Sequence, residues 1–180
     1  MIALVFDTET TGLVKNSLIP LKDQPRIIEL FGHLIDTDTD NGESVDELEF
    51  FANPGMPLEP IITKITGITD SDLRSEKPFS ANANRLKQML IRADSIVAHN
   101  LSFDLAMLQN EFSRLGEALA SPTRKICTVE QSEWYCGHRL SLTALHEHLF
   151  GEPFAGAHRA RHDVDALTRC FLEMVKRGDV

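Results

Sequence analysis

The segment IALVFDTETTG at residues 2–12 is the most informative for the fold. In it, an apolar run changes abruptly into acidic and hydroxyl side chains. Ile2 to Phe6 is rich in branched residues, the pattern of a strand buried on both faces of a sheet. Side chains two positions apart on a strand share one face, so Asp7 and Glu9 converge if the strand continues to Glu9. Two close, partly dry carboxylates repel each other unless protons or cations compensate. The segment therefore predicts a cation site, and the alternative is a polar turn beginning at Asp7.

The rest of the chain predicts a mixed α/β sheet. Apolar, branched segments indicate further strands at 26–35, 45–52, 95–98 and 125–127. Asn41-Gly42 between the first two favours a hairpin turn, so these strands should form an antiparallel meander with the N-terminal strand. Apolar residues at helical spacing indicate helices at 79–92, 101–115, 140–149 and 162–177. A proline-rich loop at 53–60 should lead into short helical turns capped by Thr69 or Asp70.

This order of elements predicts a three-layer α/β fold, with a mixed central sheet of about five strands and helices on both faces. A chain of 180 residues with 42% hydrophobic residues suits one domain spanning 1–180. No apolar stretch reaches the roughly eighteen residues of a membrane span, and no signal peptide is recognisable. We therefore expect a cytoplasmic protein without membrane contact.

Net charge and cysteine content argue against a nucleic-acid coating protein, a disulfide framework and a cysteine zinc site. The net charge of −9 argues against coating nucleic acid by charge alone, although an enzyme that contacts a few phosphates stays compatible with it. Cys127, Cys136 and Cys170 form no C-x-x-C pair, so neither a disulfide framework nor a cysteine zinc site is predicted. We expect free thiols in or near the core.

Two later segments repeat the arrangement of a polar cluster at the end of a strand or the start of a helix. AHNLSFDLAML at 98–108 places Asn100 and Asp104 where an amphipathic helix begins. AHRARHDVDAL at 157–167 places His158 five residues before Asp163, which lies in the first turn of the last helix. Each acid alone is explained by a favourable interaction with a helix N-terminus. Taken jointly with Asp7 and Glu9, they indicate one shared site.

The ordered set resembles the DnaQ-like 3′-to-5′ exonucleases with the DEDDh signature. The first motif, D-x-E-T-T-G, matches 7–12; the second, an Asn followed by an aromatic-Asp pair, matches Asn100, Phe103 and Asp104; the third, H-x4-D, matches His158 and Asp163. The sister group has tyrosine at the position of Arg159, so the chain resembles the histidine branch. NPGMPLEPIITKITGIT at 53–69 is also similar to the family, although many relatives have histidine where Thr66 stands. The resemblance covers almost the whole chain.

The resemblance implies a ribonuclease H-like fold and release of nucleoside 5′-monophosphates from a 3′ end. It implies two Mg²⁺ or Mn²⁺ ions, and oxygen ligands without cysteine favour the same metals. The implied metal ligands are Asp7, Glu9, Asp104 and Asp163. His158 is then the general base. The expected substrate contacts are Thr8, Thr10, Thr11, Gly12, Leu13, Asn100, Phe103 and Arg159.

Alternatives exist for three of these contacts and for the function. In the alternative interpretation, Asn100 caps the helix, Phe103 packs in the core, and Arg159 lies in an exposed polar loop. We expect single-stranded or frayed DNA 3′ ends as substrate and a polymerase or another replication or repair protein as partner. The alternatives are an oligoribonucleotide or RNA 3′ exonuclease, and a polymerase-associated module whose fold serves partner contact. Dimerisation is left open.

Two other clusters resemble metal sites but are interpreted otherwise. Four acids at 36–47 (Asp36, Asp38, Asp40 and Glu47) have EF-hand spacing, but Asn41 replaces the required glycine and strands flank the segment. We therefore predict a solvated hairpin loop. His146-Glu147-His148 lacks a partner pair at zinc spacing, so we expect it on the surface of a helix.

Overall fold

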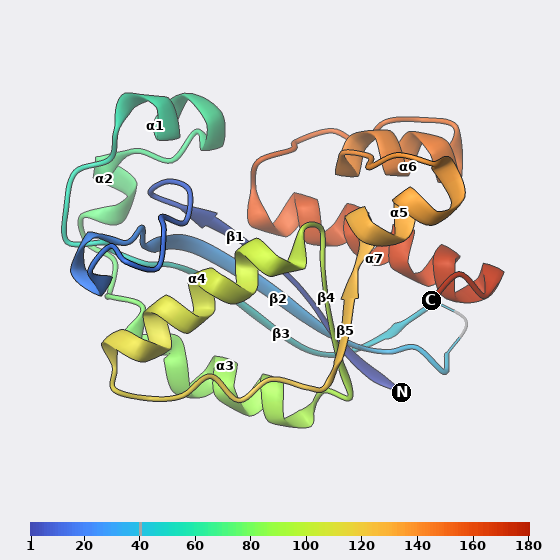
Figure 1. The fold of residues 1–180 in the computed structure, drawn as a ribbon, viewed down its shortest axis with the longest axis horizontal. Helices are drawn as coiled ribbons and strands as arrows, with labels where there is room; N and C mark the ends of the chain where they lie inside the picture. The colour runs from blue at the N-terminus through green and yellow to red at the C-terminus, as the bar shows by residue number, and fades with distance from the viewer. Residues whose placement is uncertain (40) are drawn as a thin grey trace.

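A central strand, β1 (Ile2–Thr10), organises the computed structural model, which describes residues 1–39 and 41–180 (Figure 1). The sheet has the order β3-β2-β1-β4-β5. The remaining strands are β2 (Ile27–Asp36), β3 (Glu43–Phe51), β4 (Ser95–Ala98) and β5 (Arg124–Cys127). The first three strands pair antiparallel, whereas β4 is parallel to both β1 and β5. The predicted mixed sheet of five strands is confirmed, and β1 continues beyond Glu9.

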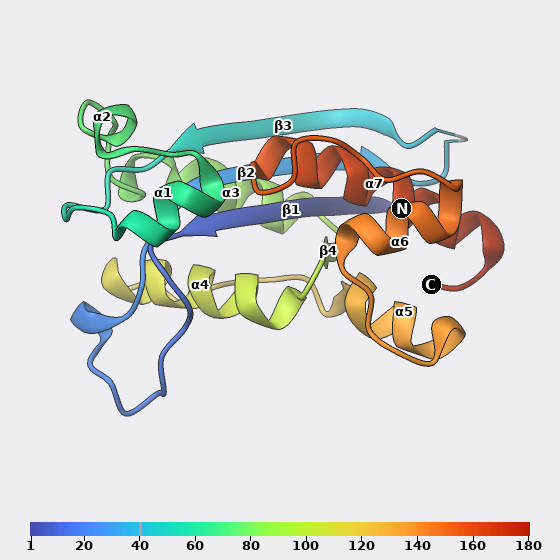
Figure 2. The ribbon, with the colours of Figure 1, turned by 90° about the horizontal axis from the view of Figure 1, so that it is seen from above.

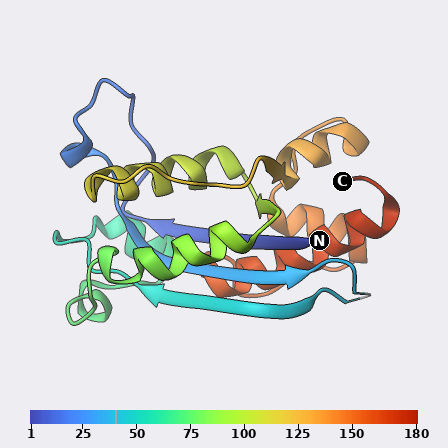
Figure 3. The same cartoon turned by 90° about the horizontal axis from the view of Figure 1, so that it is seen from below.

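Helices cover both faces of this sheet. Figure 2 shows α7 (Ala160–Arg177) in front of the sheet and α3 (Ser80–Arg92) behind it, and Figure 3 shows the reverse view. Leu4 and Phe6 of β1 pack in the core that α3 shares with α4 (Leu101–Arg114). Ala3 and Val5 pack against α7 in a second core. Because side chains alternate along a strand, the odd-numbered residues of β1 belong to the α7 face.

The remaining elements are short. They are η1 (Leu21–Asp23), α1 (Pro60–Thr66), α2 (Asp70–Leu73), α5 (Thr128–Cys136) and α6 (Leu142–Phe150). Thr69 caps α2 in a reciprocal capping box with Asp72, as its position predicts. Helix α5 was not predicted, because its residues show little apolar periodicity. Helix α6 begins later than the predicted residue 140, because Ser141 caps it by accepting a hydrogen bond from the Ala144 amide.

One surface prediction is wrong, and one residue of another prediction lies outside the described residues. His146 is 1% exposed: its Nδ1 lies 2.7 Å from the Glu152 carbonyl oxygen, and its ring packs beside Phe150 and Phe154. The periodicity of α6 turns this position inward, while Glu147 and His148 are exposed as expected. Asp40, one of the four acids with EF-hand spacing, is outside the described residues.

Cys127 and Cys170 are buried and Cys136 is partly buried, all as free thiols, which confirms that prediction. Within residues 1–39 and 41–180, no helix has both the length and the apolar character needed to cross a membrane.

The core between α3 and the sheet gives a direct stability test. Leu86 is 0% exposed in that core, whereas Ile91 on the same helix is 61% exposed. We expect Leu86→Ala to lower the free energy of unfolding by about 2–5 kcal/mol, because it removes buried methyl groups and leaves a cavity. The matched control Ile91→Ala should stay within about 0.5 kcal/mol. Urea unfolding measures both, and equal losses would contradict the assigned helix face.

Candidate active site

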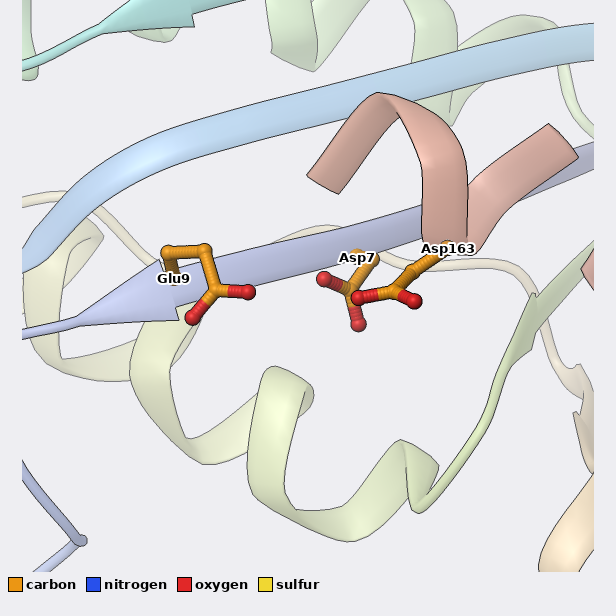
Figure 4. A group of neighbouring side chains, drawn as sticks. All are labelled: Asp7, Glu9 and Asp163. Carbon is orange, nitrogen blue, oxygen red and sulfur yellow. The ribbon is translucent and has the colours of Figure 1, made fainter. Parts of the chain in front are cut away.

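Three carboxylates from distant parts of the chain meet at one point. Asp7 and Glu9 project from β1, and Asp163 projects from the first turn of α7 (Figure 4). Each offers an oxygen atom, and these oxygen atoms lie within 4.8 Å of one another. Asp7 and Glu9 are odd-numbered residues of β1, so they share the face on which α7 packs. The strand geometry and the helix position together assemble the cluster.

Asp104 reaches the same cavity from the opposite layer. A cavity of about 590 Å³ is bordered by the three carboxylates and by Asp104 from α4. Asp104 is 2% exposed, and the Thr8 hydroxyl donates a hydrogen bond of 2.7 Å to its Oδ1. Thr8, between Asp7 and Glu9, points to the α4 side of the sheet. Strand β1 therefore presents Asp7 and Glu9 on the side of α7. On the side of α4, its Thr8 orients Asp104.

The pKa values of the carboxylates at the cavity are raised, mainly by burial. Burial raises the pKa of Asp7 well above its usual range, and the charge of Asp104 raises it further. Burial also raises the pKa of Glu9 to about 8, with Asp163 adding to the effect. The pKa of Asp104 rises to about 7 through burial, against the opposing hydrogen bond from Thr8. Oxygen donors that are costly to ionise together fit a hard divalent cation, which would relieve this repulsion.

His158 and Asn100 border the cavity, and both have a positive φ angle, which residues other than glycine rarely adopt. Their φ angles are 69° and 82°, and among the described residues they are the non-glycine residues with positive φ. The His158 amide donates a hydrogen bond of 2.9 Å to Asp163 Oδ2, while its side chain is exposed beside the cavity. Asn100 makes no side-chain capping bond to α4, so helix capping does not explain this residue. Strain of this kind concentrates at functional sites.

The expected substrate contacts divide between this cavity and an adjoining groove of about 780 Å³. Leu13 and Phe103 border both spaces; Leu13 is 81% exposed, and Phe103 is partly buried against the core. Thr10, Thr11 and Gly12 line only the groove. The Thr10 hydroxyl donates to the Gly12 carbonyl and the Thr11 hydroxyl accepts from the Arg26 amide, so both shape the turn after β1.

Arg159 lies apart from both spaces. Its Nη2 pairs with Oε1 of Glu29 at 3.0 Å, and its guanidinium stands 5.4 Å from the centre of the Phe51 ring. Glu29 is 1% exposed and also accepts from the Ala160 amide, so it secures the start of α7. Glu29 was not among the predicted site residues, and it lies opposite Glu9 in the β1–β2 register. That relation becomes visible only when the register is known.

His99 is a second residue at the cavity that was not predicted from the sequence. Its ring lies 2.9 Å from the Thr128 hydroxyl and 3.1 Å from the Leu140 carbonyl oxygen, and it borders the cavity. Burial lowers its pKa to about 4, so the ring is neutral near pH 7. Leu140 precedes Ser141, another residue of the cavity wall. The sequence signal was a histidine directly after a buried strand.

Comparison with known proteins places the chain among nucleases. The model of a family described as RNase_T, exonuclease, matches residues 4–171. The DNA polymerase III PolC-type of Bacillus subtilis is 31% identical over 177 residues, which cover 96% of this chain and 11% of that protein. The corresponding protein of Halalkalibacterium halodurans is 33% identical over 179 residues, with the same coverage. The chain thus spans about a tenth of the length of these curated relatives.

Solved structures share the fold. The nuclease domain of 3′hExo, a DEDDh family member bound to rAMP, superposes with a TM-score of 0.77 at 16% identity, covering 98% of this chain and 92% of that one. The complex of E. coli ExoI with single-stranded DNA, in a zinc-bound form, gives 0.76 at 20% identity, covering 98% and 41%. The ribonuclease H-like α/β fold predicted from the sequence is confirmed.

The raised pKa values predict that pH changes the stability of the metal-free protein. A carboxyl whose folded pKa is raised stabilises the fold fully below its unfolded pKa of about 4, and this contribution is lost as pH rises through the folded value. Asp104→Asn removes the ionisation and keeps an oxygen acceptor for the Thr8 hydroxyl. In chelator, we expect this variant to match wild type near pH 4 and to exceed it by roughly 1–4 kcal/mol near pH 9.

Thermal unfolding with chelator across this pH range measures the difference. Exposed Glu76 is the matched control, and Glu76→Gln should follow wild type throughout. Added Mn²⁺ should stabilise wild type more than Asp104→Asn, because a bound cation compensates the ionised carboxylates. A wild-type protein that gains stability with pH relative to Asp104→Asn would contradict the assigned burial.

Proposed function

We propose that this chain, which belongs to the RNase_T exonuclease family, removes nucleotides from the 3′ end of a DNA strand. The observation that carries the proposal is the meeting of Asp7, Glu9 and Asp163 in one cavity, with Asp104 and His158 at its border. Residues 1–180 then act as one exonuclease domain. Water is the co-substrate, and the product is a nucleoside 5′-monophosphate.

Four carboxylates would hold two Mg²⁺ or Mn²⁺ ions. The proposed ligands are Asp7, Glu9, Asp104 and Asp163. Their oxygen atoms suit these metals, and the Thr8 hydroxyl keeps Asp104 in one orientation. When bound, such a pair of cations polarises the attacking water and stabilises the charge on the departing 3′ oxygen.

The chain itself supplies the base and the orientation. His158 accepts a proton from the attacking water, whose oxygen bonds to phosphorus as the bond from phosphorus to the 3′ oxygen breaks. The departing 3′ oxygen takes a proton from solvent, which restores a 3′ hydroxyl on the shortened strand. Asp163 holds the His158 backbone through Oδ2, so the base stays close to the acids. Histidine suits this task because it exchanges protons near neutral pH.

The same cavity would receive the terminal nucleotide. Leu13 and Phe103 offer apolar faces for a base, and such contacts accept any base. Asn100 offers an amide at the cavity border. Thr10, Thr11 and Gly12 would contact the strand through the groove beside it. Arg159 is the weakest of the proposed contacts, because Glu29 already neutralises its charge.

DNA is the proposed substrate because the relatives at 31–33% identity are DNA polymerases. We further propose that the chain serves a polymerase or another replication or repair protein by removing mispaired 3′ ends. RNA is the rival substrate, favoured by a structural neighbour bound to rAMP. A side-by-side assay with both nucleic acids separates them.

The reaction is tested with 5′-labelled single-stranded DNA, duplex DNA with a mismatched end, and short RNA, each in Mg²⁺ or Mn²⁺ and in chelator. We expect a ladder that shortens from the 3′ end of DNA and disappears in chelator. Asp163→Asn should lower the rate about 10³-fold or more, because a metal ligand is lost. Asp165→Asn, on the same helix but outside the cavity, should stay close to wild type. Equal rates for both variants would reject the site.

The base is tested by His158→Asn, since asparagine tolerates the positive φ at this position better than alanine. We expect the rate to fall about 10²- to 10⁴-fold, while Mn²⁺ still raises the melting temperature because the carboxylates remain. The matched control is His148→Asn, at an exposed position of α6. A fully active His158→Asn protein would eliminate the histidine as base.

A further inference from the structure

The groove beside the carboxylate cavity has two dissimilar walls. One wall includes α1 and the preceding loop, where Met56, Ile61 and Ile65 are 54%, 49% and 47% exposed. The other wall belongs to the segment between β1 and β2, which contributes Lys15 and Lys22. Apolar side chains and lysines in one groove suit a nucleic-acid strand, whose bases stack on apolar surfaces and whose phosphates attract cations. Glu9, Asp23 and Glu59 also line this groove, so the lysines do not make it positively charged overall. The groove is continuous with the cavity through shared lining residues.

The segment between β1 and β2 has no apolar core of its own. Leu13 and Leu18 are 81% and 88% exposed, and its only regular structure is the short η1. Hydrogen bonds from one buried polar side chain, Gln24, hold the segment instead. Gln24, 7% exposed, accepts a hydrogen bond of 3.0 Å from the Lys15 amide through Oε1. Its Nε2 donates to the carbonyl oxygens of Lys15, Asn16 and Ile19 at 3.3, 3.1 and 3.3 Å.

Gln24 is itself fixed to α4. Arg114 Nη2 donates to the carbonyl oxygens of Leu21, Gln24 and Pro25 at 3.0, 2.9 and 3.0 Å. The Arg114 side chain is 10% exposed, and its Nη1 pairs with the buried Glu111 at 2.8 Å. Asp104 lies on the same helix. A continuous set of contacts therefore connects the helix of the carboxylate cavity to the groove wall.

We propose that Gln24 is a positioning residue for strand binding: it holds residues 15–19 as a fixed wall, so that the groove seats the nucleotides immediately upstream of the one released. The proposal rests on the proposed function for the nature of the occupant. Without these hydrogen bonds, the exposed leucines provide no packing that would keep the wall in place. Affinity for a strand then falls because binding must order the segment.

The test replaces Gln24 with methionine, which has a similar size and cannot make these hydrogen bonds. Fluorescence anisotropy with a labelled single-stranded oligothymidylate, in chelator, measures strand binding without hydrolysis. We expect Gln24→Met to weaken binding roughly tenfold, the order of a lost base contact. Gln109→Met is the matched control at an exposed position of α4 and should bind as wild type does. Equal affinity of wild type and Gln24→Met, or no strand binding by wild type, overturns the proposal.

Kinetics then separate positioning from general damage. For the oligothymidylate, Gln24→Met should raise KM and leave kcat unchanged. For the p-nitrophenyl ester of thymidine 5′-monophosphate, which occupies only the carboxylate cavity, both constants should match wild type. A parallel fall in ester hydrolysis overturns the positioning role. Wild type that binds the strand but cleaves neither substrate refutes the proposed function instead, and the binding result still decides the role of Gln24.

Trypsin cleavage after Lys15 provides a readout of the wall itself. In Gln24→Met this exposed bond should be cut faster than in wild type, while the melting temperature changes little. Arg114→Lys is the second variant, used if Gln24→Met does not fold. Lysine keeps a charge for Glu111 but lacks the planar fork that spans three carbonyl groups. It should also speed cleavage after Lys15 and raise KM for the oligothymidylate, and unchanged values of both would overturn the proposal.

Discussion

The alternation of side chains along β1 is the constraint on which the site depends. Ala3 and Val5 enter the core beneath α7, so Asp7 and Glu9 must face the same helix. A shift of one residue in register would turn both acids toward α3 and α4 and bury charge in an apolar core. The apolar half of the strand thus specifies where its acidic half points. The packing of the core and the meeting of the carboxylates therefore both depend on the same strand register.

Placing these carboxylates together in one cavity has an electrostatic cost. Burial raises the pKa values of Asp7, Glu9 and Asp104, and the charges of neighbouring acids raise those of Asp7 and Glu9 further. Full ionisation of these carboxyls therefore opposes folding near neutral pH. The strained backbone at Asn100 and His158 adds to this cost at the same cavity. In the proposed function, cations and substrate in the cavity would offset both costs. The surrounding core, including fully buried Leu86, supplies the stability that makes the cost tolerable.

Sequence patterns predicted those parts of the molecule in which local chemistry and periodicity agree. The five strands, the long helices and the capping of α2 followed from alternation, helical spacing and the side chain of Thr69. Relations between distant side chains could not be obtained in this way. Glu29 becomes recognisable only through its pairing opposite Glu9. His146 lies at an inward position of α6, but its contact with the Glu152 carbonyl oxygen depends on the loop that follows the helix. Gln24 carries no periodic signal, because its partners are backbone groups of an irregular segment.

The two spaces at this edge of the sheet are built on different physical principles. Acids on β1, α4 and α7 are positioned by packed secondary structure, which holds reacting groups with little freedom. The groove wall depends instead on hydrogen bonds from two side chains, Gln24 and Arg114, and most of its other residues are exposed. Such a wall can change in length and composition without disturbing the core, because few apolar contacts cross to it. The proposed chemistry therefore depends on the register of the sheet. The proposed preference for a particular nucleic-acid strand depends on a segment whose sequence the core does not restrict.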